Sequence, residues 1–282
     1  MSFAPRPAPS IPTLLAGDAK IPAIGLGTSM LANCGEIVAT ALKLGYRHID
    51  TAWKYGSERG VGEGMRAAGV PRGEIFLCTK VSHEYLRAAD FARSVDESLA
   101  NLGVDHVDLL LVHWPNAAIP LKETMGALAK AKRDGLARHI GVANFNIALL
   151  DEAIALCREP LVNLQGEGHP YIDTEKIVEA CRARGVVFTA YCPLGRGRLL
   201  NDPVLGAIAK RNGRTLAQVA LRWLVQRGNI LPIPRSSNPG RLAENLDVFS
   251  FTLSDDEMAR IGALKRADGR IANPPGRAPT WD

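Results

Sequence analysis

The sequence predicts an α/β fold: a (β/α)8 TIM barrel with an N-terminal β-hairpin and a C-terminal tail over the barrel mouth. Short runs of β-forming residues alternate along the chain with amphipathic segments of helical period, which favours a parallel sheet with helices between its strands. The chain has 282 residues, and barrels of this kind form one domain of about 250 residues. The run Val-Asp-Leu-Leu-Leu-Val at 107–112 is nearly all apolar, as expected for a parallel strand covered on both faces.

The predicted elements follow in a regular order. Residues 1–12 are expected to form a flexible Pro-rich tail, and 13–22 a hairpin that plugs the barrel bottom. Strands are predicted at 23–27, 47–50, 75–80, 107–112, 138–142, 161–165, 186–191 and 230–233. Helices are predicted at 35–44, 58–68, 88–102, 121–134, 146–157, 174–184, 215–227 and 239–246, with short ones near 203–211 and 254–264. The segment from Arg266 to Asp282 shows neither a helical nor a strand period. We expect residues 13–282 to form a single domain.

The predicted connections from helix to strand share one residue pattern. Basic or polar residues in a last helical turn are followed by a glycine, at Gly45, Gly103, Gly135, Gly185 and Gly228. Cations favour a helix C-terminus, and glycine takes the left-handed conformation that ends a helix at little cost. Each join therefore predicts a helix end directly before a strand.

Composition excludes several classes of protein. With 46% hydrophobic residues the chain can bury a large core, and no apolar run approaches the roughly 18 residues that span a membrane. The N-terminus lacks the apolar core of a secretory signal, so we expect a cytoplasmic protein. The net charge of +5 is mild and its basic residues are dispersed, which suits an anionic cofactor and not a nucleic acid. We expect a monomer. The five cysteines and six histidines show no spacing typical of metal ligands, so we also expect reduced cysteines and no metal.

Four polar side chains lie at the C-terminal ends of predicted strands or in the loops that follow them. They are Asp50, Tyr55, Lys80 and His113. A parallel barrel gathers the C-terminal ends of its strands on one face, so these side chains are expected to meet. A tyrosine has a pKa of about 10, and a nearby ammonium lowers it. The set therefore predicts a site for reducing a carbonyl, in which Tyr55 gives the proton and His113 binds the carbonyl oxygen.

The local sequences around these residues resemble the aldo-keto reductase family. Gly-Tyr-Arg-His-Ile-Asp-Thr-Ala-Trp-Lys-Tyr-Gly (45–56), Cys-Thr-Lys-Val (78–81) and Leu-Leu-Leu-Val-His-Trp-Pro (109–115) match the contexts of its Asp–Tyr–Lys–His tetrad. Short loops resemble the bacterial 2,5-diketo-D-gluconate and methylglyoxal reductase branch. The resemblance implies hydride transfer from NADPH to an aldehyde, ketone or α-dicarbonyl, with Tyr55 as proton donor.

A phosphate site is predicted where the last strand leads into a helix. Arg235 and Arg241 flank Ser236 there, and helix N-termini and guanidinium forks both bind phosphate, so the segment suits a 2′-phosphate. It resembles the NADPH-selecting stretch of the family, with Arg235 in place of lysine, which leaves exclusion of NAD open. The resemblance assigns Glu244 and Asn245 to the adenine. Gly27, Thr28 and Asp50 complete the expected contacts on this side.

Further cofactor contacts are implied by resemblance. Gly-Val-Ala-Asn-Phe (141–145) resembles a family stretch in which serine and asparagine bind the nicotinamide amide, and here only Asn144 carries over because Ala143 has no hydroxyl. Gln165 is assigned to the same amide. Gly168 departs from the tyrosine usual before His-Pro. Tyr191 is expected to stack on the nicotinamide, and the loop after it to cross the pyrophosphate through Cys192, Pro193, Leu194 and Gly195.

The substrate is a small carbonyl compound on this interpretation. Contacts are expected from Ser29, Met30, Trp53, Lys54, Trp114 and Trp281. A cation at Lys54 would favour a polar or anionic substrate such as a keto-sugar acid, and the alternative is a lysine that faces solvent.

Two other functions remain open at this stage. A regulatory protein of the same fold would bind NADPH and turn over little, and a turnover assay separates the two. A barrel isomerase or aldolase would instead form a Schiff base on Lys80, which borohydride would trap.

Overall fold

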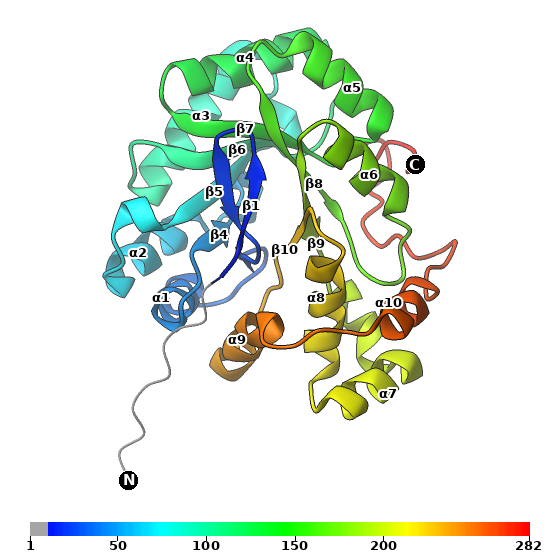
Figure 1. Cartoon of the computed structure of the whole chain (residues 1–282). Coiled ribbons are helices and arrows are strands. Elements are labelled where there is room, and N and C mark those ends of the chain that lie inside the picture. Colours follow the sequence, from blue (N-terminus) through cyan, green and yellow to red (C-terminus); the bar gives the residue numbers. More distant parts are fainter. Residues whose placement is uncertain (1–10) are drawn as a thin grey trace.

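The structure is a computed structural model that describes residues 11–282. Eight parallel strands form one sheet in chain order, and helices surround it (Figure 1). The strands are β3 (Leu26–Gly27), β4 (His48–Asp50), β5 (Phe76–Val81), β6 (Val107–Val112), β7 (Ala137–Ala143), β8 (Leu161–Glu167), β9 (Val187–Tyr191) and β10 (Ile230–Pro232). Gly25 N–H donates to Pro232 O and Gly27 N–H to Pro234 O, each at 3.1 Å, so the two edges of the sheet meet. The predicted barrel of parallel strands is confirmed.

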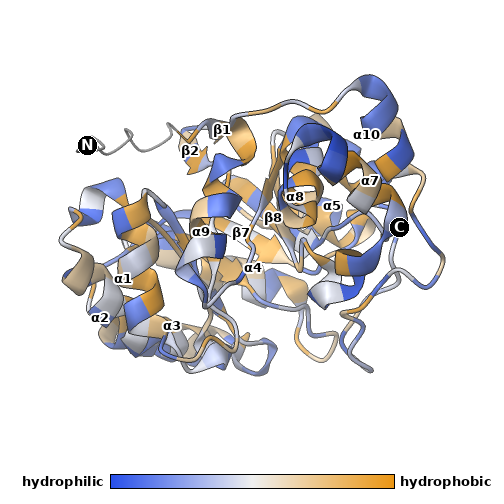
Figure 2. Cartoon of the chain, turned by 90° about the horizontal axis from the view of Figure 1, so that it is seen from below, coloured by the Kyte–Doolittle hydropathy of each residue, from blue (hydrophilic) through white to orange (hydrophobic). Residues whose placement is uncertain are grey.

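The helices lie between the strands, as predicted. They are α1 (Cys34–Leu44), α2 (Glu58–Ala68), α3 (Ala88–Leu102), α4 (Leu121–Arg133), α5 (Ile147–Leu156), α6 (Glu175–Ala183), α7 (Pro203–Asn212), α8 (Leu216–Gln226), α9 (Pro239–Leu246) and α10 (Asp255–Gly262). Hydrophobic residues concentrate on the strands, and hydrophilic residues on the outer helices (Figure 2). Within the described part of the chain, no helix combines the length and apolar character that a membrane crossing requires.

The predicted glycine joins take the conformation that ends a helix. All five have positive φ, at Gly45, Gly103, Gly135, Gly185 and Gly228. At Gly45 φ is 114°, and its N–H bonds to the carbonyls of Ala41 and Leu42 at the end of α1. Because residues with a Cβ rarely adopt this conformation, glycine fixes where the helix stops and the chain turns into β4.

The predicted hairpin closes the N-terminal end of the barrel. Strands β1 (Thr13–Ala16) and β2 (Ala19–Pro22) pair antiparallel. Ala16, Ala19 and Ile21 pack in one buried cluster with inward-facing strand residues such as Leu109 and Leu231. Figure 1 shows the dark blue hairpin across the centre of the barrel. The opposite end, where the C-terminal ends of the strands meet, is the barrel mouth.

Two strands differ by more than one residue from the predicted bounds. The first strand is predicted at 23–27 but includes only Leu26 and Gly27, since Ala23 N–H bonds to Pro12 O beside the hairpin. Strand β8 runs to Glu167, two residues beyond the predicted end at 165, because Glu167 still pairs with Tyr191 of β9. The predicted tail at 1–12 falls almost wholly outside the described residues.

The C-terminal segment continues without regular structure after α10, as predicted. Its last residues reach the N-terminus of α5, where Asn146 Nδ2 donates to Thr280 O at 3.3 Å and Ile147 N–H donates to Asp282 Oδ2 at 2.7 Å. Figure 1 shows this red segment ending near α5 and α6. Because α5 follows β7 directly, the segment lies at the barrel mouth.

Candidate active site

The four predicted catalytic side chains come together at the barrel mouth. Asp50 ends β4, Tyr55 lies in the short turn after it, Lys80 lies near the end of β5, and His113 follows β6. These three strands are neighbours in the sheet. Parallel pairing in register therefore brings their C-terminal ends side by side.

Lys80 and Asp50 form a buried ion pair. Lys80 Nζ lies 2.6 Å from Asp50 Oδ1, and the two side chains are 0% and 2% exposed. The ammonium also donates to Thr51 O at 2.7 Å, and Gln165 Nε2 donates to Asp50 Oδ2 at 2.8 Å. Burial alone would lower the pKa of Lys80, but the Asp50 carboxylate raises it above its ordinary value, so the lysine stays charged at neutral pH.

Tyr55 lies beside this ammonium. Lys80 Nζ is 5.2 Å from the centroid of the Tyr55 ring. The sequence predicts that Lys80 lowers the pKa of Tyr55. Lys80 does act in that direction, but burial has the larger and opposite effect, and the pKa of Tyr55 is raised from its ordinary value. Tyr55 is therefore a neutral phenol at neutral pH and keeps a proton to donate.

His113 faces Tyr55 edge to face. The two ring centroids are 5.5 Å apart at 82°. Burial, followed by the charge of Lys80, lowers the pKa of His113 to about 3. A neutral imidazole therefore stands beside the phenol, with one N–H to donate to an oxygen atom.

The side chains predicted to hold a nicotinamide form hydrogen bonds with one another and with residues of the predicted tetrad. Asn144, at a positive φ of 64°, donates from Nδ2 to His113 O at 2.9 Å and accepts at Oδ1 from Tyr191 Oη at 2.7 Å. Gln165 bonds to Asp50, as described above. Asn144 N–H also donates to Gln165 O at 2.7 Å, so these bonds connect the predicted cofactor residues with Asp50 and His113 in one network.

The glycine at position 168, where the family usually has tyrosine, is explained by close packing. A Cβ at Gly168 would lie 2.8 Å from Ala190 Cβ and 3.3 Å from the Phe188 ring. Strand β9 packs too closely for a side chain at this position. The close approach is a tertiary contact that the local sequence does not reveal.

Gly27, which ends β3, and Thr28 after it lie where the sheet closes beside the barrel mouth. A Cβ at Gly27 would lie 2.8 Å from Ile233 O, so the sheet closes there only around glycine. Thr28 donates to Asp50 O from both its backbone N and Oγ1, each at 3.0 Å. Thr28 therefore supports Asp50 from the neighbouring strand.

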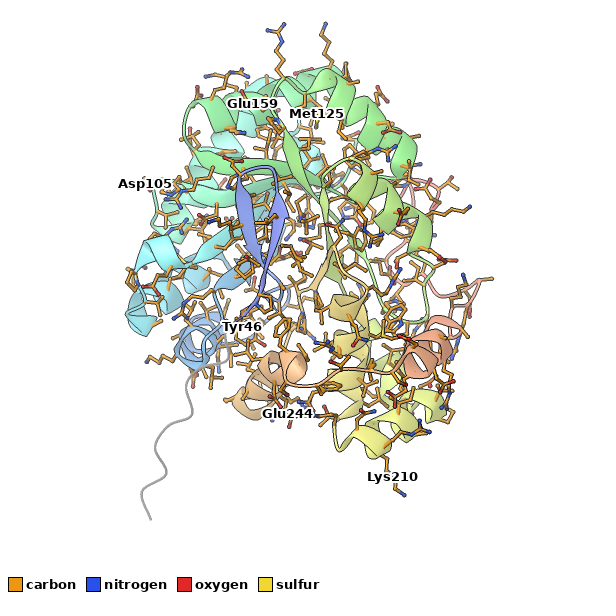
Figure 3. All side chains as sticks on the ribbon, in the orientation of Figure 1. Tyr46, Asp105, Met125, Glu159, Lys210 and Glu244 are labelled. Atoms are coloured by element: carbon orange, nitrogen blue, oxygen red, sulfur yellow. The ribbon has the colours of Figure 1, made fainter. Side chains whose placement is uncertain are left out.

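The predicted phosphate segment lies at the surface. Arg235, Ser236 and Arg241 are at least partly exposed, and Arg235 Nη1 donates to the carbonyls of Ser29 and Met30, each at 3.1 Å. Of the two residues predicted to contact adenine, Glu244 points outward from α9 (Figure 3), and Asn245 is buried.

Sequence reasoning missed one residue in this segment. The side chain of Asn238 caps α9, since its Oδ1 accepts from Gly240 N at 2.9 Å and Arg241 N at 3.3 Å. The signal was present in the sequence, because Asn followed by Pro is a typical helix start.

The loop after β9 turns sharply. Cys192 has a φ of 49°, and Gly195 a φ of 56°. Pro193 and Gly195 are buried, whereas Leu194 and Cys192 are partly exposed. The loop thus leaves the mouth directly beside Tyr191.

The predicted substrate contacts have diverse surroundings. Trp53 packs edge to face on Tyr85, with ring centroids 4.8 Å apart, and Trp114 is partly buried. Ser29 is partly exposed, and Met30 is 86% exposed. Lys54 is exposed, and its Nζ lies 2.9 Å from Glu84 Oε2.

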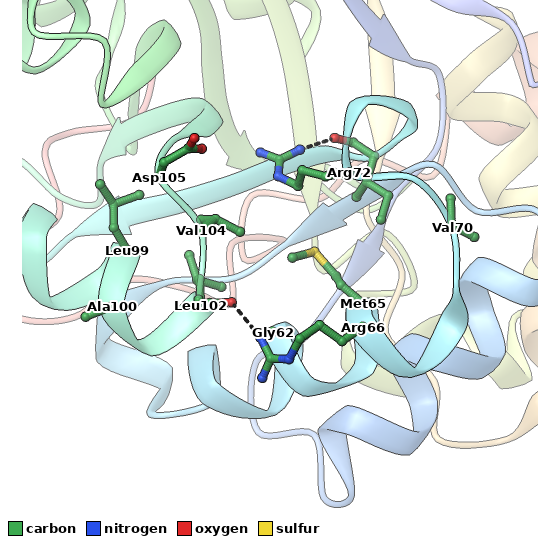
Figure 4. A pocket seen from close by; sticks show the side chains of 12 residues that line it. Gly62, Met65, Arg66, Val70, Arg72, Leu99, Ala100, Leu102, Val104 and Asp105 are labelled. Carbon is green, nitrogen blue, oxygen red and sulfur yellow. Dashed lines mark hydrogen bonds between the residues drawn. The ribbon is translucent and has the colours of Figure 1, made fainter.

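A cavity of about 690 Å³ lies away from this site. Figure 4 shows it between α2 and α3, lined by Met65, Leu99, Leu102 and other residues, none of them from the tetrad. Across residues 11–282 no group of His, Cys, Asp and Glu side chains is arranged to hold a metal ion.

A sequence model described as the aldo/keto reductase family matches residues 23–266, from before β3 to beyond α10. The chain belongs to the aldo/keto reductase family. It is therefore an oxidoreductase that acts on carbonyl groups, and the predicted family is confirmed.

Known relatives agree with this assignment. An aldo-keto reductase of Mycolicibacterium smegmatis is 43% identical over 262 residues, 91% of this chain and 92% of the relative. A methylglyoxal reductase of Salmonella typhi is 40% identical over 267 residues, 93% of this chain and 99% of the relative. The similarity therefore extends over nearly the full length of each.

Solved structures confirm the fold. A crystal structure of a protein provisionally named 2,5-diketo-D-gluconic acid reductase B superposes with a TM-score of 0.95 at 43% identity, over 96% of this chain and 98% of that one. The Bombyx mori aldo-keto reductase in complex with NADP superposes with a TM-score of 0.87 at 32% identity, over 95% and 96%. Aldo-keto reductases use nicotinamide cofactors, in keeping with the second of these.

Proposed function

We propose that this aldo-keto reductase uses NADPH to reduce small aldehydes, ketones or α-dicarbonyl compounds, with Tyr55 as the proton donor. One observation carries the proposal: a neutral phenol lies beside a charged lysine and a neutral histidine at one barrel mouth. This set can protonate a carbonyl oxygen and stabilise the charge that results. Natural relatives named as a methylglyoxal reductase and a 2,5-diketo-D-gluconic acid reductase support small dicarbonyl substrates.

The residues at the mouth fit a nicotinamide dinucleotide with a 2′-phosphate. Arg235 and Arg241 are exposed, and they flank the partly exposed Ser236 in the sequence. Guanidinium forks bind phosphate through paired hydrogen bonds. The amides of Asn144 and Gln165 and the ring of Tyr191 would hold the nicotinamide end. When bound, the cofactor supplies the hydride.

Each member of the tetrad has a separate task in this mechanism. Tyr55 Oη transfers its proton to the carbonyl oxygen as the carbon becomes an alcohol carbon. The Lys80 ammonium stabilises the phenolate that remains, and Asp50 keeps that ammonium charged and in place. His113 donates a hydrogen bond to the same carbonyl oxygen and thereby orients the substrate.

The proposal is tested by following NADPH absorbance with methylglyoxal, 2,5-diketogluconate and benzaldehyde. We expect oxidation of NADPH with at least one of them. Binding of NADPH without turnover of any carbonyl would contradict the proposal and favour the regulatory alternative. Borohydride trapping of a substrate on Lys80 would favour the Schiff-base alternative.

The pH dependence of carbonyl reduction follows from the two titrating groups. Tyr55 must be protonated, and its pKa is raised from the ordinary value, so activity is lost only in strongly alkaline solution. His113 must be neutral, and its pKa is lowered to about 3. We therefore expect kcat/KM for reduction to be nearly constant from about pH 6 to about pH 9. A decline centred near neutrality would assign the proton donation to another group.

Cofactor choice is expected to depend on Arg241. In Arg241→Ala we expect the Kd for NADPH to rise about tenfold to a hundredfold, as for loss of a hydrogen bond to a charged group. The Kd for NADH should change little, because NADH has no 2′-phosphate. Quenching of tryptophan fluorescence measures both, with Arg93→Ala on the distant α3 as control. Equal losses for the two cofactors would contradict the assignment.

A further inference from the structure

Glu58 is a buried carboxylic acid that the proposed mechanism does not use. It is the first residue of α2, and it is 2% exposed. Its Oε1 accepts from Thr79 Oγ1 on β5 at 2.5 Å. Burial raises the pKa of Glu58 from its ordinary value, and the Thr79 hydroxyl acts in the opposite direction. This bond attaches the start of α2 to a strand that lies 21 positions further along the chain.

Thr79 lies directly before the tetrad residue Lys80 on β5. Successive side chains of a strand point to opposite faces of the sheet. Lys80 bonds to Asp50 in the barrel interior, so Thr79 faces the surrounding helices, where it meets Glu58. The ammonium and the hydroxyl therefore leave the same short length of strand on its two sides.

The turn that carries Tyr55 is attached to β5 at both ends. On its N-terminal side, Thr51 N–H donates to Cys78 O at 2.9 Å, and Thr51 O accepts from Lys80 Nζ at 2.7 Å. On its C-terminal side, Glu58 makes the bond described above. Both attachments therefore lead to three consecutive residues of the strand.

Between the two attachments the turn is partly open to solvent. Lys54 and Gly56 are exposed, and Gly56 has a φ of 65°. The backbone N–H of Tyr55 donates to Ala52 O at 3.0 Å, which is a bond within the turn itself. The position of the Tyr55 ring relative to Lys80 therefore depends on where the two ends of the turn are held.

We propose that Glu58 is a positioning residue for carbonyl reduction, whose bond to Thr79 fixes the C-terminal end of the turn and thereby keeps Tyr55 beside the tetrad ammonium. The assignment rests on the proposed carbonyl reduction. A buried carboxyl group is costly unless it is hydrogen-bonded, and a hydrogen bond has a direction that apolar packing lacks. Displacement of a reacting group by about 1 Å can lower a rate about a hundredfold, so a small shift of the turn matters.

The test removes the hydroxyl that Glu58 accepts from. In Thr79→Val we expect kcat to fall about tenfold to a hundredfold with the best of the three carbonyl compounds named above. The KM and the Kd for NADPH should stay close to those of wild type, and kcat is counted per NADPH-binding site from a tryptophan fluorescence titration. Thr79→Ser keeps the hydroxyl and should restore most of kcat. Thr124→Val is the matched control, because Thr124 is similarly buried and its Oγ1 donates elsewhere, to Leu86 O on the far side of α3.

A second comparison separates positioning from a general effect on the fold. In the Tyr55→Phe background no phenolic proton remains to be positioned, so Thr79→Val should change the residual kcat by less than about twofold. An effect on the fold would act independently of the acid. The same loss in both backgrounds would therefore overturn the assignment.

Glu58→Met approaches the same bond from α2. It removes the acceptor and keeps a side chain of similar length, so it serves if Thr79→Val does not fold. The same fall in kcat at unchanged KM would support the assignment, and unchanged kcat in either variant would overturn it. Absence of turnover in wild type would overturn the proposed reduction as well, so the wild-type assay tells the two failures apart.

Discussion

Tyr55→Phe is expected to lower kcat for carbonyl reduction by about 10²- to 10⁴-fold, the range for loss of a general acid. Phenylalanine keeps the ring that faces His113 but has no proton to give. The Lys80–Asp50 pair is untouched, so the Kd for NADPH and the thermal stability should remain close to those of wild type. The measurement is NADPH absorbance under saturating substrate.

Tyr85→Phe is the matched control for this experiment. Tyr85 packs on Trp53 near the same mouth but lies outside the tetrad. It should keep nearly all of the activity. If Tyr55→Phe were as active as wild type, another group would have to supply the proton, and the mechanism would be abandoned.

Lys80→Met is expected to reduce the free energy of unfolding by about 3–5 kcal/mol, as for breaking a buried ion pair at one partner. Asp50 would then be left without its cation at 2% exposure, with the Gln165 amide as a neutral donor to one of its oxygens. Activity should also be lost, since no ammonium remains to stabilise the Tyr55 phenolate. Denaturant unfolding measures the first effect, and NADPH oxidation the second.

The double variant Asp50→Asn/Lys80→Met separates stability from chemistry. It removes both charges, so most of the lost stability should return, because no uncompensated ion is left in the interior. Its activity should stay as low as that of Lys80→Met. Recovery of activity with recovery of stability would mean that Lys80 acts only on the fold.

The sequence predicted the candidate site because its polar side chains lie close to the C-terminal ends of predicted strands. Asp50, Lys80 and His113 lie at or beside the C-terminal ends of consecutive strands, and parallel pairing alone brings such ends together. The glycine joins were predictable for a similar reason, since the left-handed conformation at Gly45 is a local property of the chain.

The contacts that the sequence did not reveal join distant parts of the chain. The bond from Gln165 to Asp50 spans 115 positions, and those from Glu167 to the tail span 104 and 105. Nothing in the residues near Glu167 distinguishes it from an ordinary strand carboxylate. Likewise, the position of Arg235 against Ser29 and Met30 depends on how the barrel closes, which short-range patterns do not describe.

The closure of the barrel at Gly25 and Gly27 has a thermodynamic consequence. The first and last strands of the sheet come from opposite ends of the chain, and Arg235 adds a third connection across the same seam. A ligand that binds across this junction holds both strands at once, so its binding free energy adds to the cohesion of the ring. Ligand binding and separation of these two strands therefore oppose each other by mass action.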